Sequence, residues 1–398
     1  MSQREAAVSQ REAAAGAVII ARSVHGLEWI AADEIALRFP AVRGPALTRR
    51  ELTFRVPVLD PELLRLRTVD DAFLQVGRVE SVGTARDVPA LLAKAMAGLD
   101  FPARLAQLRQ IRADIPGRPA FDVVASLEGR RNYNRFAVEN AVGAALATVL
   151  RGSYLERSSA GRQAGEPDLT VRVLLRDTTA IAALRLGRRP LHRREYKQDT
   201  GPGTLHPPMA AALGRLAATA GVVLDPFCGD GTVVIESALS YPDTLALGSD
   251  LDPVRLANAR GNAQRAGART FLVRADAAHP VWRPGHVDAL VTNPPWNVAV
   301  AGGGKLKNSL NPLWSVLPGL LAPDGRICLI ADAGLDAPES LRRLGYAITV
   351  RSQIRLAGRL SHLVLCAPPG RAAPQLSHTQ TAWRNRSIEE GLLTEDGF

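Results

Sequence analysis

Two short motifs, DPFCGDGT at 225–232 and NPPW at 293–296, constrain this chain more than any other feature. The first lies between two apolar segments, which predicts a glycine-rich loop joining a strand to a helix. The second follows the apolar run at 287–292, which predicts another strand end. Strands and helices alternate from 207 to 370, so we expect a doubly wound parallel sheet with a late antiparallel strand. Ligands of such sheets bind at the carboxyl ends of the strands.

The glycine-rich loop predicts a site for a nucleoside-bearing cofactor. Gly229 and Gly231 allow a tight turn and close backbone approach. The loop is neither GxGxxG nor GK[ST], which argues against a dinucleotide and a triphosphate. Asp250 follows the next predicted strand, placed for ribose hydroxyls, and Asp276 follows the one after, placed for an adenine amine. Each acid alone could equally cap a turn; together with the loop they favour the cofactor.

The NPPW motif predicts a clamp for the exocyclic amine of a planar base. The Asn293 side-chain oxygen and the Pro294 carbonyl can accept the two N–H bonds of such an amine. Pro294 and Pro295 hold the backbone because each ring fixes φ. Trp296 can stack on the base, which contributes roughly 1–3 kcal/mol in comparable sites. A strand-to-loop turn is the alternative for the motif alone, which also leaves adenine N6, guanine N2 and glutamine open.

Positive charge is concentrated in one part of the chain. The net charge is +10, and residues 129–197 hold 14 Lys and Arg against 6 Asp and Glu. Such a localised excess is typical of proteins that bind polyanions. An arginine-rich solvated surface is the alternative, but the concentration in one stretch favours nucleic acid.

Several sequence features that would indicate membrane insertion, secretion or metal binding are not found in this sequence. No apolar run has the length of a membrane span, and the start lacks the pattern of a signal peptide. The three cysteines are far apart and show neither metal spacing nor a disulfide framework. We therefore expect a cytoplasmic protein that binds neither membrane nor metal, and we expect a monomer.

The motifs and the order of the predicted parts resemble the THUMP-domain class I S-adenosylmethionine-dependent RNA guanine-N2 methyltransferases, which include tRNA enzymes that form N2-methylguanosine in the acceptor stem. The resemblance covers about residues 17–370. Its matching segments are GLEWIAADEI, LLRLRTVDDAFLQVGR, FDVVASLEGRRNYNRFAVENAVG, LHRREYK, GTLHPPMAAAL and the two motifs above.

The resemblance implies an α/β protein: a C-terminal Rossmann-like class I methyltransferase domain after N-terminal ferredoxin-like and THUMP α+β modules. It implies S-adenosylmethionine as cofactor, S-adenosylhomocysteine as product, and RNA, expected to be tRNA, as partner. The expected division is a disordered leader at 1–16, a ferredoxin-like domain at 17–80, a THUMP-like RNA-binding domain at 81–187, a basic linker at 188–206, the methyltransferase domain at 207–370 and a disordered tail at 371–398.

Motifs and resemblance together give three sets of candidate residues. The catalytic set is Asn293, Pro294, Pro295 and Trp296. The cofactor set is Thr204, Leu205, Pro207, Asp225, Phe227, Cys228, Gly229, Gly231, Thr232, Asp250, Asp276 and Asn293. The RNA set, expected to contact phosphates and to position the RNA without reading its sequence, is Arg130, Arg131, Arg135, Arg188, Arg189, Arg193, Arg194 and Lys197.

Two positions depart from the family pattern. Asn297 follows the aromatic residue of the NPPW motif where many relatives have glycine, and Asp230 adds a carboxylate where GSGT is commoner. The leading hypothesis is N2-methylation of a guanosine in tRNA. The alternatives are a guanine-N2 or adenine-N6 methyltransferase of 23S ribosomal RNA and, in another class, a non-catalytic RNA-binding scaffold.

Overall fold

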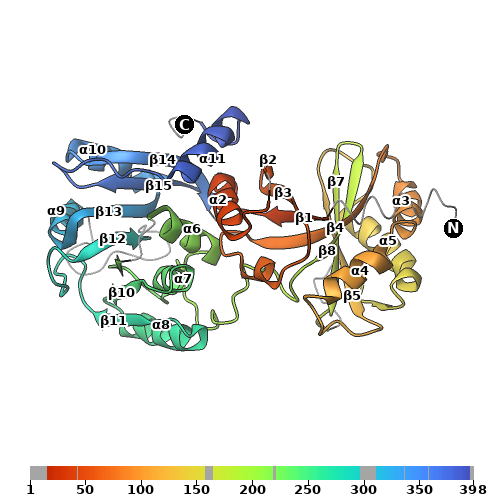
Figure 1. The fold of residues 1–398 in the computed structure, drawn as a ribbon, viewed down its shortest axis with the longest axis horizontal. Helices are drawn as coiled ribbons and strands as arrows, with labels where there is room; N and C mark the ends of the chain where they lie inside the picture. Colours follow the sequence, from red (N-terminus) through yellow and green to blue (C-terminus); the bar gives the residue numbers. More distant parts are fainter. Residues whose placement is uncertain are drawn as a thin grey trace.

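The computed structural model has two lobes, each built on one mixed β-sheet, and they meet where α2, α6 and α11 lie together (Figure 1). It describes residues 16–42, 44–156, 165–217, 221–295, 311–335, 337–356 and 358–394. Trp296, Asn297 and all of the expected leader except Gly16 lie outside these ranges. Across the described part of the chain, no helix is both long and apolar enough to cross a membrane.

The N-terminal lobe contains an eight-stranded sheet with the order β2-β3-β1-β4-β8-β7-β5-β6. Its strands are β1 (Ala17–Arg22), β2 (Ala46–Thr48), β3 (Glu51–Val56), β4 (Asp71–Val79), β5 (Ala120–Leu127), β6 (Ser153–Tyr154), β7 (Leu169–Arg176) and β8 (Thr179–Arg185). Antiparallel pairing of β4 with β8 joins the strands of the expected 17–80 and 81–187 modules into this one sheet.

Helices of the N-terminal lobe pack on one face of that sheet around a common apolar core. They are α2 (Glu28–Arg38), the 3-10 helix η1 (Pro61–Arg65), α3 (Val88–Ala97), α4 (Phe101–Arg109) and α5 (Arg135–Val149). Side chains cap three of their starts, because Asp60 accepts from the Glu62 N–H, Asp100 from the Ala103 N–H and Asn134 from the Ala137 N–H.

The C-terminal lobe contains a seven-stranded sheet with the order β11-β10-β9-β12-β13-β15-β14. Its strands are β9 (Val222–Asp225), β10 (Leu245–Asp250), β11 (Thr270–Arg274), β12 (Val287–Thr292), β13 (Leu321–Asp332), β14 (Ala347–Leu356) and β15 (Arg359–Ala367). The first five are parallel, and β15 is antiparallel to both of its neighbours. The late antiparallel strand expected from the sequence is therefore confirmed.

Helices on both faces of this second sheet complete the lobe (Figure 1). They are α6 (Pro207–Ala217), α7 (Thr232–Ser240), α8 (Pro253–Ala266), α9 (Asn311–Leu320), the short η3 (Ala333–Leu335), α10 (Ala337–Arg343) and α11 (His378–Glu389). The DPFCGDGT motif begins at the end of β9, Asp250 is the last residue of β10 and Asp276 follows β11, so the strand order brings all three to one edge of the sheet.

Helix α2 fixes the two lobes to each other. Its Trp29 and Ile30 are buried in the same apolar cluster as Met209 of α6, on the C-terminal lobe. Arg215 of α6 donates through Nε to Asp33 of α2 at 2.8 Å. An apolar contact and an ion pair thus hold the eight-stranded sheet of the N-terminal lobe in a defined position beside the seven-stranded sheet of the C-terminal lobe.

Glu236 of α7 joins two further parts of the chain. Its carboxylate is fully buried and accepts from Arg67 Nε at 2.7 Å, from Arg194 Nε at 3.0 Å and from the Tyr196 hydroxyl at 2.8 Å. Burial alone would raise the pKa of this carboxyl, but Arg194 and Arg67 outweigh burial and hold the pKa below its ordinary value. Arg67 precedes β4, and Arg194 and Tyr196 lie in the expected linker, so the linker is clamped between the lobes.

The prediction of a disordered tail is wrong for residues 378–389, because they form the helix α11. A capping box starts this helix, with the Ser377 hydroxyl bonded to the Gln380 N–H and the Gln380 side chain bonded to the Ser377 N–H. The Gln380 amide also donates to the Arg215 carbonyl at 3.2 Å, and Trp383 packs against both lobes. The polar composition of the segment concealed a helix that is stabilised mainly by packing on α2.

Candidate cofactor and target site

A pocket of about 990 Å³ opens at the carboxyl ends of β9, β10 and β12. Its size is that of sites for small organic ligands. The predicted residues that line it are Thr204, Leu205, Asp225, Phe227, Cys228, Gly229, Thr232, Asp250, Asp276, Asn293, Pro294 and Pro295. Two members of the cofactor set are absent from this lining. Pro207 begins α6 and lines a neighbouring pocket, and Gly231 is the N-cap of α7.

The glycine loop has the backbone geometry that its sequence predicts. Gly229 and Gly231 have φ of 51° and 86°, values that side chains rarely permit. A Cβ on Gly231 would also lie 3.0 Å from the Cβ of Ala259. The Gly229 N–H donates to Asp250 Oδ2 at 2.9 Å, so the first strand's loop is fastened to the end of the second strand.

The two predicted acids stabilise turns and line the pocket at the same time. Asp250 Oδ1 accepts from the Asp252 N–H at 2.9 Å, and Asp276 Oδ1 accepts from the Ala278 N–H at 2.9 Å. A carboxylate offers about four acceptor positions, and Asp250 uses two of them, for the Asp252 and Gly229 N–H groups, so acceptors remain for hydroxyl donors. The turn-cap alternative and the ligand role are therefore compatible.

Asn293 presents an acceptor without a partner. Its Nδ2 donates to the Gly203 carbonyl at 3.3 Å, while its Oδ1 is buried and has no hydrogen-bond partner among the described residues. Leaving a buried acceptor unpaired costs about 1–3 kcal/mol, so such an atom indicates a site for a donor from a ligand. The adjacent Pro294 is buried and Pro295 is half-buried, both on the pocket wall.

Asp230 lines the cofactor pocket, where a carboxylate beside the cofactor was expected, and it also makes contacts within the protein. Its Oδ2 accepts from the Gly201 N–H at 2.8 Å, from the Thr204 hydroxyl and from Arg255 Nη1 at 3.2 Å. Asn258 donates to its other oxygen at 3.0 Å. This departure from the commoner serine therefore fastens the linker over the glycine loop. Sequence reasoning missed Arg255 and Asn258, which have no motif of their own.

Comparison with known proteins identifies the family. Residues 194–358 match the UPF0020 family model (RMKL-like, methyltransferase domain). Over 315 residues the chain is 31% identical to the tRNA (guanine(6)-N2)-methyltransferase of Thermus thermophilus, covering 77% of this chain and 86% of that protein. The chain belongs to the THUMP-type RNA guanine-N2 methyltransferases. The resemblance seen in the sequence is confirmed.

Two further comparisons agree with the family. The crystal structure of TrmN from Thermus thermophilus superposes with a TM-score of 0.69 at 29% identity, covering 88% of this chain and 99% of that chain. This chain is also 31% identical to a tRNA (guanine(10)-N2)-dimethyltransferase of Methanothermobacter thermautotrophicus over 166 residues. The match covers 41% of this chain and 48% of that relative.

S-adenosylmethionine fits the pocket of this methyltransferase. The bare backbone of the glycine loop permits close approach, Asp250 and Asp276 offer acceptors to hydroxyls and amines, and the unpaired Asn293 oxygen lies at the next strand end. Leu205 and Thr204 close the side formed by the linker, where Lys197 Nζ donates to the Leu205 carbonyl at 2.6 Å.

The RNA set divides by exposure. Arg130, Arg135, Arg188 and Arg193 are exposed, and Arg189 is exposed but paired with Glu166 at 2.6 Å. Arg131 is half-buried and donates to the carbonyls of Gly83, Glu128 and Asp177.

Arg194, expected to contact RNA, is used within the protein, where Glu236 and the carbonyls of Leu191 and Arg67 accept from its guanidinium. Lys197 is also turned inward, and burial lowers the pKa of its amine to about 8. Other arginines of the basic stretch pair within the front sheet, as Arg176 does with Glu51. The surface charge is therefore smaller than the sequence count suggests.

Asp225 gives the methyltransferase a stability that depends on pH. Burial, aided by Asp250, raises the pKa of this carboxyl to about 7, although hydrogen bonds from Thr292 at 2.7 Å and the Phe227 N–H at 3.0 Å oppose the shift. The folded protein thus favours the protonated acid. Its contribution is fully present below the unfolded pKa of 3.8 and is lost as pH rises through about 7.

Replacing Asp225 by asparagine should remove this pH dependence, because the amide keeps an acceptor for Thr292 and Phe227 but cannot ionise. Between about pH 5 and pH 7, wild type should lose on the order of 2 kcal/mol relative to Asp225→Asn, at about 1.4 kcal/mol per pH unit. Urea unfolding across this range measures the difference. Parallel pH profiles of the two proteins would contradict the assignment.

Proposed function

We propose that this chain transfers a methyl group from S-adenosylmethionine to the N2 amine of guanosine 6 in the acceptor stem of tRNA. The observation that carries the proposal is the unpaired, buried Asn293 Oδ1 at the carboxyl end of β12. It lies in the same pocket as the glycine loop, in a chain that belongs to the guanine-N2 methyltransferases. The nucleotide position follows the name of the Thermus thermophilus relative.

The chemistry asked of the chain is mainly positioning. The cofactor supplies an electrophilic methyl group on a sulfonium. Asn293 Oδ1 and the Pro294 carbonyl accept the two N–H bonds of the guanine amine, which favours a pyramidal nitrogen and directs its lone pair toward the cofactor side of the pocket. The prolines keep both acceptors in place because φ is fixed at each. A stem guanosine must first leave its base pair, which costs a few kcal/mol.

The N-terminal lobe is proposed to hold the RNA, with residues 17–80 as a ferredoxin-like module and 81–187 as a THUMP module. Arg130, Arg135, Arg188 and Arg193 support this because they are exposed and are not used in the ion pairs described above. We also propose that the protein acts as a cytoplasmic monomer. Its three cysteines are free and buried, as expected in a reducing compartment.

Removing two exposed linker charges should weaken RNA binding in a way that depends on salt. The double variant Arg188→Ala/Arg193→Ala should bind tRNA less tightly at low salt, with a slope of log affinity against log salt reduced by up to about 1.8, or about 0.9 per lost phosphate contact. Filter binding at several salt concentrations measures the slope. Arg342→Ala, at an exposed position of α10, is the control and should leave the slope unchanged. An unchanged slope in the double variant would remove the linker from the RNA footprint.

Nucleoside mass spectrometry of RNA classes from cells lacking the gene tests the substrate. The expected result is loss of N2-methylguanosine from tRNA with ribosomal RNA unaltered. Loss from 23S ribosomal RNA alone, or loss of N6-methyladenosine instead, would overturn the proposal in favour of those alternatives. Unchanged methylation in every class would favour the non-catalytic scaffold, against which the intact glycine loop argues.

A further inference from the structure

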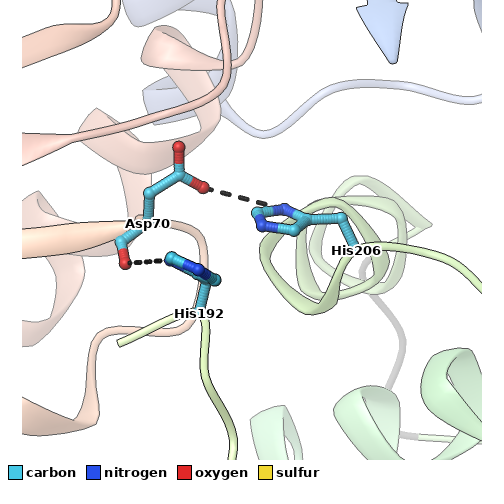
Figure 2. A group of neighbouring side chains, drawn as sticks. All are labelled: Asp70, His192 and His206. Atoms are coloured by element: carbon cyan, nitrogen blue, oxygen red, sulfur yellow. Dashed lines mark hydrogen bonds and ion pairs between the residues drawn. The ribbon is translucent and has the colours of Figure 1, made fainter. Parts of the chain in front are cut away.

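A cluster of Asp70, His192 and His206 lies where the two lobes and the linker meet (Figure 2). The three residues come from separate parts of the chain: Asp70 directly precedes β4, His192 lies in the linker, and His206 directly precedes α6. One oxygen or nitrogen from each residue lies within 4.8 Å of the others, and all three side chains are half-buried.

Asp70 and His206 are spaced for a shared ion rather than for a direct bond. His206 Nδ1 lies 3.7 Å from Asp70 Oδ1, beyond hydrogen-bond range. Asp70 Oδ1 is buried and has no hydrogen-bond partner among the described residues. Two ligands of a tetrahedral zinc ion, each bonded at about 2.0–2.1 Å, lie about 3.3 Å apart. Shifts of a few tenths of an ångström would bring this pair to that spacing.

His192 is held in the orientation that metal-binding imidazoles commonly have. Its Nδ1 lies 3.1 Å from the Asp70 backbone carbonyl, and its backbone N–H donates to the same oxygen at 2.9 Å. A proton on Nδ1 that is donated to a carbonyl fixes the tautomer and leaves the Nε2 lone pair free for a ligand bond. Figure 2 shows the His192 ring beside the Asp70 backbone and the His206 ring facing the Asp70 carboxylate.

We propose that Asp70, His192 and His206 form a binding site for a divalent transition metal, with zinc as the best-fitting ion. Two imidazoles and one carboxylate are a ligand set that zinc accepts, and a water molecule completes the tetrahedron. This site goes beyond the proposed methyl transfer and does not depend on it. It also departs from the metal-free protein expected from the sequence, where three ligands separated by up to 136 positions form no motif.

Two cationic side chains lie near the cluster, and one of them is paired with a carboxylate. Arg194 is paired with Glu236 at 3.0 Å, and Lys197 donates to the Leu205 carbonyl. Burial raises the pKa of the Asp70 carboxyl, although the charges of His192, Arg50 and Arg22 oppose the shift.

A metal at this cluster would bind the N-terminal lobe, the linker and the C-terminal lobe at once, because each contributes one ligand. His206 lies between the cofactor pocket and a second pocket of about 820 Å³, which Arg189, Arg193 and His192 also line. An ion here therefore fixes the wall segment that contains Leu205 and precedes α6. Since Asp70 is in the front lobe, the same ion fixes that lobe relative to the pocket.

Zinc titration of tag-free, full-length protein tests the proposal. The protein is stripped with chelator, dialysed, titrated with zinc chloride in a calorimeter, and assayed for retained zinc after gel filtration. We expect one zinc ion per chain and a rise in Tm with zinc concentration, because the ion binds only the folded state. His192→Ala and Asp70→Asn should each weaken binding by at least about 10-fold, since loss of an outer-shell partner alone costs that much.

His286→Ala is the matched control, since its imidazole is exposed and, among the described residues, bonds only to the nearby Pro284 carbonyl. It should bind zinc as wild type does. Circular dichroism of each metal-free variant shows whether it folds, and Asp70→Asn provides a nearly isosteric change if His192→Ala does not fold. No retained zinc in wild type, or equal zinc binding by wild type and a folded Asp70→Asn, would overturn the proposal.

Discussion

Replacing Asn293 by alanine should lower kcat for methyl transfer by about 100- to 1,000-fold, the usual cost of removing one preorganised polar group from an active site. The affinity for S-adenosylhomocysteine should change by less than about threefold, because the Asn293 side chain makes only one described hydrogen bond, to the Gly203 carbonyl. Single-turnover methylation and calorimetry measure the two effects separately.

The separation between turnover and binding is what assigns Asn293 its role. Asn132→Ala is a suitable control because Asn132 is exposed on the N-terminal lobe, away from the pocket. Unchanged turnover in Asn293→Ala would refute the amine clamp. A loss of turnover matched by an equal loss of cofactor affinity would make Asn293 a residue of the cofactor site only.

Replacing Glu236 by glutamine should destabilise the fold by about 3–5 kcal/mol, as breaking a buried ion pair usually does. The amide keeps the shape of the side chain but leaves the half-buried Arg67 and Arg194 without this counter-charge. The linker and the front lobe should loosen together because these arginines come from both. Urea unfolding and hydrogen exchange of the linker measure the effect.

Glu339→Gln is the matched control for Glu236. Glu339 lies on α10 in an exposed pair with Arg342 at 3.8 Å, and exposed pairs of this kind contribute about 0–1 kcal/mol. The control should therefore unfold nearly as wild type does. A Glu236→Gln variant as stable as the control would show that the buried carboxylate does not hold the lobes together.

The cofactor side of the site was predictable because local sequence determines it. Gly229 and Gly231 have the positive φ that their loop requires, Asp250 ends β10, and Asp276 follows the adjacent parallel strand β11. In such a sheet the strand ends converge, so residues that follow successive strands come together in space. The strand order therefore places residues that are far apart in the sequence around one pocket.

Roles that depend on long-range contacts could not be predicted in this way. Arg194 is of the residue type that commonly contacts phosphates. Only the fold shows that Glu236, 42 positions away, accepts a hydrogen bond from its guanidinium. Asp230 and Asp70 likewise acquire their partners through the path of the linker. The helix α11 was missed because its stability comes from packing on α2, although its S-x-x-Q start at 377–380 is a recognisable capping signal.

The central claim is methyl transfer to guanine N2 in tRNA, and it is tested most directly with purified protein, S-adenosylmethionine and an unmodified tRNA transcript. Nucleoside mass spectrometry and RNase mapping should find N2-methylguanosine at position 6 of the acceptor stem, and a transcript with adenosine at that position should remain unmethylated. N6-methyladenosine in the product, or methylation of ribosomal RNA fragments but not of tRNA, would contradict the account.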